Sequence, residues 1–216
     1  MKLWTLITPK DYDLLKSNQS VLATPPNNIM KETQDWFLSI TKFKNWPVWT
    51  YLNNPNKDTI ANFCQEQETT SENQPMGFLL ELNITNNEKM AFFSDCAWEY
   101  IKNYLYLDND ENTSKFQEKC RALGIDYFKD KPVNHPDIHK EIVESWKHLL
   151  DLQWCAKNIK NSHKKEQMAV CIQHIHPKWV ENTYILTPRV LESYKIPFNS
   201  KTNIPTITNK SNRLAI

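Results

Sequence analysis

Glycine is nearly absent from this chain, and its scarcity limits the folds that the chain can adopt. The 216 residues include two glycines, Gly77 and Gly124. Loops that bind the phosphates of dinucleotides or nucleoside triphosphates need several closely spaced glycines, because the main chain must approach the phosphate without side chains in the way. The sequence therefore excludes dinucleotide-fold dehydrogenases, P-loop NTPases and kinases. The G-x-S-x-G and H-E-x-x-H motifs of common hydrolases and zinc proteases are also absent from the sequence.

The composition is that of a globular protein with balanced charge. Hydrophobic residues make up 40% of the chain and charged residues 24%, and the net charge at pH 7 is +1. A chain of this length can bury a substantial core. The balanced charge gives no electrostatic reason to expect a nucleic-acid or membrane partner. Because Pro9, Asp11 and Asp13 interrupt the first apolar run and no long apolar run follows, we expect a soluble, cytoplasmic protein.

The cysteines do not form a recognisable pairing pattern. They are five in number, widely spaced, and none belongs to a C-x-x-C motif. An odd number of scattered cysteines argues against a disulfide framework. We therefore predict reduced and mostly buried thiols. These residues are Cys64, Cys96, Cys120, Cys155 and Cys171.

Periodic apolar residues predict strands and helices in mixed order. Thr8 is placed to cap a helix that starts at Pro9, and Ser94 to cap a helix after the strand "KMAFF". Gly124 is placed to end a polar helix. The strand "GFLLELNI" at 77–84 is the clearest, and we expect "KMAFF" to pair with it. Further strands are predicted at 3–7, 47–52 and 167–174, and further helices at 30–44, 136–154 and from Pro177 to Tyr184.

Strands and helices alternate without a regular βαβ rhythm, which favours an α+β fold with a mostly antiparallel sheet and flanking helices. Residues 53–76 are polar and are predicted to form a loop with one helical turn near 60–63. We expect a single domain over residues 1–194. The segment 195–216 contains two prolines and has no helical stripe, so we expect an extended or partly disordered tail.

Two pairs of histidines have spacings that could bring each pair to one face. His135 and His139 are four residues apart, and His174 and His176 are two apart on a predicted strand. A four-histidine zinc site is conceivable. No cysteine or carboxylate completes a known ligand spacing, however, and histidines at strand ends are commonly solvated. We therefore expect no metal.

The eight tryptophans divide into two groups. Trp4 and Trp49 lie in short predicted strands beside Thr5 and Thr50, whose hydroxyls can face a ligand. Sheet packing is the more ordinary explanation for these residues. The tryptophans on apolar helical stripes are expected in the core rather than on a nucleobase-stacking surface. They are Trp36, Trp98, Trp146 and Trp154.

Two polar pairs lie at the ends of predicted strands. Ser94 and Asp95 stand where a strand passes into a helix, so their side chains and the free amides there can hold an anionic or polar ligand. The simpler explanation is that Ser94 caps the helix and Asp95 complements its dipole. Glu166 and Gln167 precede the strand "MAVCI" and can project into a cleft. Most polar residues in such positions merely contact water.

The motifs "LWTLITPKDYDLL", "PVWTYL", "FLLELNI", "FFSDCAWEYIKNYLYL", "IVESWKHLLDL" and "EQMAVCIQHIHPKWV" resemble a bacterial family, domain-of-unknown-function family 3841. The resemblance covers most of residues 3–185, and it brings no activity. The polar segment 53–76 and the chain after Tyr194 lie outside it.

The order of these motifs is similar to that of ADP-ribosyltransferases, particularly bacterial toxins that modify nucleic acids. The similarity implies a split antiparallel sheet whose cleft binds NAD as a substrate. It implies that Thr5 occupies the first-strand position where the family has His or Arg. It places Trp49 and Tyr51 at the wall of the nicotinamide site. It places either Glu166 or Gln167 at the position of the family's catalytic acid. The acceptor of ADP-ribose would be a nucleic acid or a protein.

Two departures from that family leave an alternative open. Thr5 is neutral, and a shift of register by one residue decides whether Glu166 or Gln167 faces the cleft. A glutamine can bond a ribose hydroxyl, but it carries no negative charge to stabilise a developing cation. The alternative is a catalytically silent module that binds a nucleotide or a protein partner.

Overall fold

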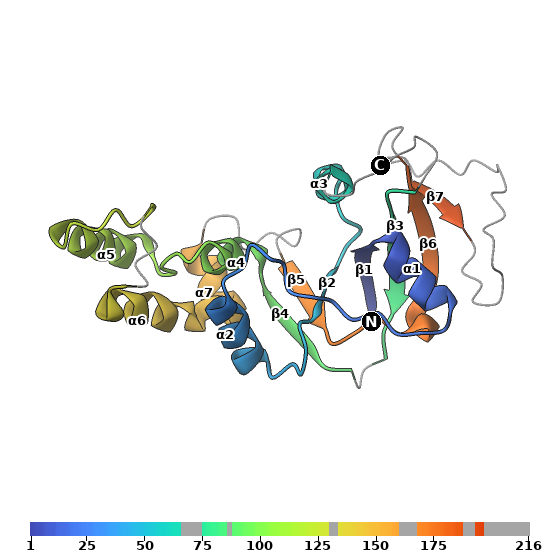
Figure 1. Ribbon diagram of the computed structural model, residues 1–216, viewed down its shortest axis with the longest axis horizontal. Helices are drawn as coiled ribbons and strands as arrows, with labels where there is room; N and C mark the ends of the chain where they lie inside the picture. The colour runs from blue at the N-terminus through green and yellow to red at the C-terminus, as the bar shows by residue number, and fades with distance from the viewer. Residues whose placement is uncertain (66–74, 86–87, 130–133, 160–167, 188–192, 197–216) are drawn as a thin grey trace. The chain divides into compact units, whose positions relative to one another are not determined.

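The computed structural model describes residues 1–65, 75–85, 88–129, 134–159, 168–187 and 193–196 (Figure 1). The chain forms two compact units, each assembled from separate segments. Unit 1 comprises residues 1–23, 47–90 and 171–216, and unit 2 comprises residues 24–46 and 91–170. No helix in these described ranges is long and apolar enough to cross a membrane.

Unit 1 is built on an antiparallel sheet whose central strand is β3. Its strands lie in the order β2-β1-β3-β6-β7, and each pairs antiparallel with its neighbour. Together with the flanking helices, this sheet confirms the predicted α+β class. The strands are β1 (Lys2–Ile7), β2 (Val48–Tyr51), β3 (Gly77–Asn83), β6 (Val180–Leu186) and β7 (Ser193–Ile196).

A short helix covers each face of this sheet. On one face, Tyr12 of α1 (Pro9–Lys16) stacks on Phe78 with ring centroids 3.8 Å apart. On the other face, α3 (Lys57–Gln65) packs Ile60 and Cys64 against Leu79 and two residues of β6. Alternation along the strands therefore gives each helix a set of apolar side chains to cover. The predicted loop at 53–76 thus contains a full helix, α3, because Ile60 and Cys64 share one helical face.

Gly77 allows α3 to lie close to the sheet. A Cβ at this position would be 2.4 Å from Cε1 of Phe63 and 2.9 Å from the carbonyl oxygen of Ile7. Real Cβ atoms do not approach other atoms so closely, so only glycine fits here without a shift of its neighbours. The need for close approach, rather than backbone conformation, explains this glycine.

Unit 2 is mainly helical and encloses a cluster of aromatic rings. Phe37 lies at its centre, with its ring centroid 5.0 Å from that of Trp98 and 5.7 Å from that of Phe93. Trp146 is fully buried, and its indole Nε1 donates a hydrogen bond to the Leu105 carbonyl at 2.8 Å. The elements are α2 (Lys31–Thr41), β4 (Met90–Ser94), α4 (Asp95–Lys102), α5 (Asp110–Ala122), α6 (Pro136–Ser145), the 3-10 helix η1 (Trp146–Leu150) and α7 (Leu152–Asn158).

The residues predicted to begin or end helices do so. The Thr8 side chain accepts a hydrogen bond from the Asp11 amide, and the Ser94 side chain accepts one from the Ala97 amide. Gly124 has a φ of 72° just after α5, as a left-handed helix end requires. Local chemistry therefore predicted these three boundaries correctly.

Three predictions were wrong, one about the pairing of a strand and two about helices. The strand 89–93 does not pair with β3, because β1 and β6 occupy both of its edges; β4 instead neighbours β5 (Met168–Ile172). The helix predicted from Pro177 is one 3-10 turn, η3 (Pro177–Trp179), followed by β6. The long helix predicted over 136–154 is divided into α6, η1 and α7. The predicted tail, residues 195–216, lies outside the described residues except for the end of β7.

Candidate functional site

Strand register in unit 1 aligns four side chains across one face of the sheet. Trp4 is paired with Tyr51 on β2 and with Glu81 on β3, and Glu81 is paired with Asn182 on β6. Directly paired residues point to the same face and lie side by side. We call Tyr51, Trp4, Glu81 and Asn182 the aromatic-carboxylate row.

Glu81 is the charged member of this row and is 8% exposed. Its carboxylate accepts hydrogen bonds from Lys2 Nζ at 2.9 Å and from Asn182 Nδ2 at 2.5 Å. Lys2 also pairs with Glu181 at 3.1 Å, and hydrogen bonds to the two glutamates raise the pKa of Lys2. A buried carboxylate needs such partners, because its desolvation without them costs several kcal/mol. That cost is on the order of the free energy of unfolding of a whole domain. The row thus holds an oriented negative charge beside two aromatic rings.

The aromatic members of the row are partly exposed, and α3 covers the neighbouring part of the same face. Trp4 and Tyr51 are half-buried, and Trp4 lies 5.9 Å from the ring of Tyr184, one row further along β6. Trp49 shares this face with Tyr51, since the two are separated by one residue of β2. Half-exposed rings beside a fixed carboxylate can stack on a planar ligand and bond its hydroxyl groups.

Thr5 points to the opposite face of the sheet from Trp49 and Tyr51. It is fully buried, and its hydroxyl donates a hydrogen bond to the Trp49 carbonyl oxygen at 2.8 Å. Thr50, predicted as a second ligand-facing hydroxyl, is likewise buried. The structure therefore brings Trp49 and Tyr51 together on one face and separates Thr5 from them.

Ser94 and Asp95 belong to unit 2, where Ser94 is buried at the start of α4. Its Oγ accepts a hydrogen bond from the Ala97 amide at 3.3 Å, so the hydroxyl caps the first turn of the helix. Burial raises the pKa of Asp95, and the charge of Glu99 raises it further, while Lys102 opposes both. The capping function predicted for Ser94 is thus present, and Asp95 is a carboxyl whose ionised form is disfavoured.

The pair predicted as the catalytic acid, Glu166 and Gln167, lies outside the described residues. β5 begins at the next residue, Met168, and its residues from Ala169 to Ile172 are buried. The strand predicted at 167–174 is therefore present from Met168 to Ile172.

Three of the four histidines considered as zinc ligands contact neighbouring groups, and His135 precedes α6 without a side-chain hydrogen bond that caps it. His139 contacts the Tyr104 hydroxyl through Nδ1 and Glu32 through Nε2, the latter at 2.8 Å. His176 accepts a hydrogen bond from the Lys178 amide at 3.1 Å, and His174 stacks on Trp179. Within the described ranges, no group of three or more His, Cys, Asp or Glu residues could hold a metal ion.

The five cysteines are free thiols, as predicted, and Cys96 alone among them is half-buried rather than buried. Burial raises the pKa of the Cys155 thiol to about 12. A thiol with so high a pKa stays protonated at neutral pH and is a poor nucleophile. Cys155 therefore has a packing function in unit 2.

Glu81 is the candidate functional residue that the sequence predictions missed. Its signal was present, since it is the acidic residue in the otherwise apolar run "GFLLEL". A charged residue that interrupts a strand of this kind must find partners, and this requirement can be recognised without a structure. The identity of those partners depends on β6, which is about a hundred residues away in sequence, Asn182 being 101 residues from Glu81.

Comparison with known proteins gives a family and no described relative. Neither a curated protein nor a solved structure matches the chain. The family described as a domain of unknown function, DUF3841, matches residues 3–181. This match spans the strands β1 to β5 and all helices of the described chain. The chain therefore belongs to the DUF3841 family.

Proposed function

We propose that unit 1 binds a nucleotide of the NAD or ADP-ribose class on the aromatic-carboxylate row. The observation that carries this proposal is the register that sets Trp4 and Tyr51 beside the buried carboxylate of Glu81. The two rings offer flat surfaces for nicotinamide or adenine. Glu81 and Asn182 offer an acceptor and an amide for the hydroxyls of a ribose.

The charges around the row suit a ligand that carries both hydroxyls and phosphates. Glu81 is held by Lys2 and Asn182, so its oxygens keep a fixed direction. Lys2 is well exposed, with 62% of its side chain accessible, and its ammonium can reach a phosphate beyond the start of β1. Stacking on an aromatic side chain contributes roughly 1–3 kcal/mol per base and is tolerant of the base's identity.

The stronger form of the proposal is transfer of ADP-ribose from NAD to a nucleic acid or protein, with Glu166 as the acid that orients the ribose. It rests on the similarity of motif order to ADP-ribosyltransferases. The buried Thr5 favours binding without transfer. Its hydroxyl donates a hydrogen bond to the Trp49 carbonyl oxygen, so the side chain is not available to bind a ligand. Binding and transfer are therefore tested separately.

Isothermal titration of the full chain with NAD and ADP-ribose tests binding. We expect Trp4→Leu and Glu81→Gln each to weaken binding about tenfold or more, since each removes an interaction of about 1–3 kcal/mol. The matched control is Glu181→Gln, which removes the other carboxylate paired with Lys2 but lies outside the row. Circular dichroism verifies that each variant is folded. If neither nucleotide binds the unaltered chain, the proposal fails and a protein-binding module is the better explanation.

Release of nicotinamide tests transfer. The chain is incubated with NAD and either a mixed DNA and RNA substrate or a protein extract, and nicotinamide and adducts are quantified by mass spectrometry. We expect Glu166→Ala to abolish release and Gln167→Ala to retain it. Binding of NAD without release, in every acceptor mixture, would leave the silent binding module as the function.

A further inference from the structure

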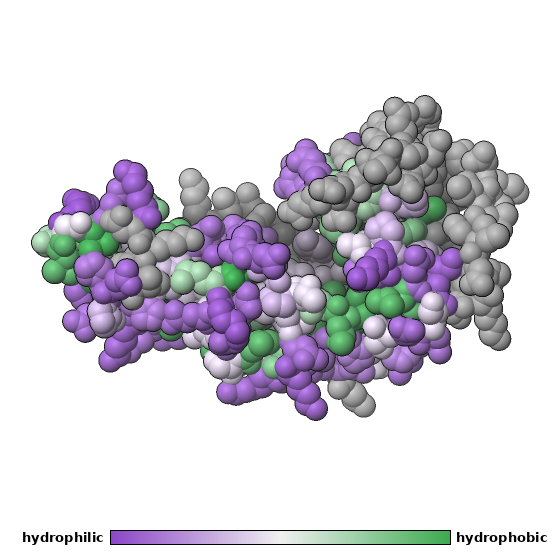
Figure 2. All heavy atoms as spheres, viewed as in Figure 1, coloured by the Kyte–Doolittle hydropathy of each residue, from purple (hydrophilic) through white to green (hydrophobic). Residues whose placement is uncertain are grey.

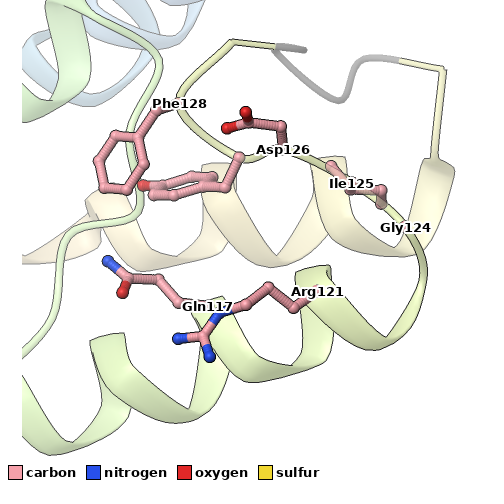
Figure 3. Close-up of a pocket in the computed structure, with 7 residues that line it drawn as sticks. Gln117, Arg121, Gly124, Ile125, Asp126 and Phe128 are labelled. Atoms are coloured by element: carbon pink, nitrogen blue, oxygen red, sulfur yellow. The ribbon is translucent and has the colours of Figure 1, made fainter.

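A pocket in unit 2, distinct from the aromatic-carboxylate row, lies between the last turns of α5 and the loop that follows (Figure 3). Its volume is about 470 Å³. Gln117 and Arg121 project into it from the helix, and Phe128 faces them from the loop (Figure 3). Its lining combines the polar side chains of Gln117, Arg121 and Asp126 with apolar and aromatic ones, and a concave site of this size can hold a ligand.

The floor of the pocket is held in place by the end of α5. The Gly124 amide donates to the Arg121 carbonyl at 3.0 Å, and the Ile125 amide donates to the Cys120 carbonyl at 2.9 Å. These two bonds form the Schellman motif, which fixes the path of the chain beyond the helix. Tyr127 is buried and packs edge-on against Phe116 with ring centroids 5.2 Å apart. These contacts fix the main chain that carries Gly124, Ile125 and Tyr127 along the pocket.

Two large apolar side chains at this end of α5 are left in solvent. Phe128 is 68% exposed and packs against the ring of Tyr127, and Leu123 is 56% exposed. Figure 2 shows hydrophobic residues among hydrophilic ones over the part of unit 2 where α5 lies. Leu123 does not line the pocket, so a small ligand inside it would leave this residue exposed. A partner that covers both residues must extend beyond the pocket.

The charges near the pocket leave Arg121 available to a ligand. Three lysines, on α5 and on the described part of the loop, each pair with an acid: Lys115 with Glu111, Lys119 with Glu141, and Lys129 with Asp126, whose carboxylate also lines the pocket. Arg121 forms no ion pair with any residue in the described part of the chain. A guanidinium at a pocket wall is suited to a carboxylate, which it can bind with two parallel hydrogen bonds. A nucleic acid is disfavoured, because these three lysines are already paired with acids.

We propose that this pocket binds an acidic segment of a partner protein, in which a carboxylate bonds Arg121 and a nearby aliphatic or aromatic side chain packs on Phe128 and Leu123. Gln117 adds an amide beside the guanidinium (Figure 3). The chain thus has a protein-docking surface in unit 2 in addition to the nucleotide site proposed for unit 1. Neither proposal depends on the other.

The scarcity of glycine provides a direct test. A chain labelled with ¹⁵N-glycine gives two amide signals, from Gly124 in the pocket and Gly77 in unit 1. The probes are pools of blocked pentapeptides that carry one Asp or Glu and one Leu or Phe, and matched pools with Asn or Gln in place of the acid. We expect the acidic pool to shift the Gly124 signal in a saturable manner and to leave Gly77 unmoved. The amide pool is expected to bind at least about tenfold more weakly, the equivalent of about 1.4 kcal/mol.

Variants on the same helix identify the residue that binds the acid. Arg121→Gln is expected to remove the preference for the acidic pool, and Phe128→Ser to weaken binding of both pools. The control Lys115→Gln alters a paired cation on the same helix and is expected to bind normally. Equal binding of the two pools, or an unaltered preference in Arg121→Gln, overturns the proposal. A Gly124 shift that depends on protein concentration without peptide also overturns it, since a second copy of the chain would then be the occupant.

Discussion

Asp95 shows how one half-buried carboxyl makes stability depend on pH. Burial and the nearby Glu99 raise its pKa in the folded chain. In the unfolded chain, the pKa of an aspartate is about 3.9. Between these two values the folded state binds the proton more tightly, so stability decreases as pH rises through this range. Below about pH 3.9 both states are protonated and the effect disappears.

We therefore expect Asp95→Asn to be more stable than the unaltered chain at neutral pH and equal to it near about pH 3. The burial cost should exceed the attraction of the α4 helix start, which is about 0.3–1 kcal/mol. Urea unfolding at both pH values measures the difference. Asp126→Asn is the control of opposite sign, because a hydrogen bond from Lys129 lowers the pKa of Asp126. That variant should lose stability at neutral pH and lose none in acid, and a destabilised Asp95→Asn at neutral pH would contradict the prediction.

At the residue scale, the sequence predicts what a side chain requires more readily than what satisfies it. The requirement for partners follows from Glu81 standing in an apolar strand, yet Lys2 and Asn182 come from distant segments. The bonding partner of Thr5 was equally unpredictable from the sequence. A threonine in a strand can face either side, and only the register with Trp49 shows that its hydroxyl is used by the main chain. Long-range pairing decides the chemistry of both residues.

At the element scale, the helix ends were predictable because capping is local chemistry. Thr8, Ser94 and Gly124 each act within four residues of their own position. The pairing of strands was not predictable in this manner. The expected β3–β4 hairpin fails because β1 and β6 pair with β3 instead, and their pairing depends on residues far away in sequence. β6 was mistaken for a helix because the proline at 177 suggested a helix start, although the β-branched and aromatic residues of "VENTYIL" favour a strand.

The contact of α3 with the sheet gives a prediction at this scale. Gly77→Ala should destabilise unit 1 by about 1–3 kcal/mol, because the new methyl group collides with the ring of Phe63 and with the Ile7 carbonyl. Replacing Phe63 with alanine should relieve part of this cost, so the double variant should lose less than the sum of the two single ones. Gly124→Ala is the control: nothing lies within 4 Å, and only its φ of 72° causes strain, worth about 1 kcal/mol. Urea unfolding of the two single variants and the double variant measures the free energies of unfolding. Strict additivity of the Gly77→Ala and Phe63→Ala losses would contradict the prediction.

At the scale of the whole molecule, each compact unit is assembled from segments that are separated in sequence. Unit 1 needs its first strand, its middle strands and β6 from beyond residue 171, whereas unit 2 is interrupted by residues 47–90. The sheet of unit 1 is therefore complete only when the late strands have joined it. Local patterns describe each element but carry no information about this interleaving, so the sequence could not predict which segments form which unit.

The two units give a prediction for hydrogen exchange. Leu80 is fully buried in unit 1, and Ile142 is fully buried in unit 2, so replacing either with alanine should cost about 2–5 kcal/mol in its own core. A core residue stabilises the cooperative unit that contains it, and exchange reports the opening of that unit. We expect Leu80→Ala to accelerate amide exchange in β1, β3 and β6 alone, and Ile142→Ala to accelerate it in α2, α4 and α6 alone. Glu118→Gln, an exposed change on α5, should accelerate neither set. Mass spectrometry of peptides from each unit makes the comparison, and faster exchange in both units from either core variant would mean that the chain opens as one cooperative body.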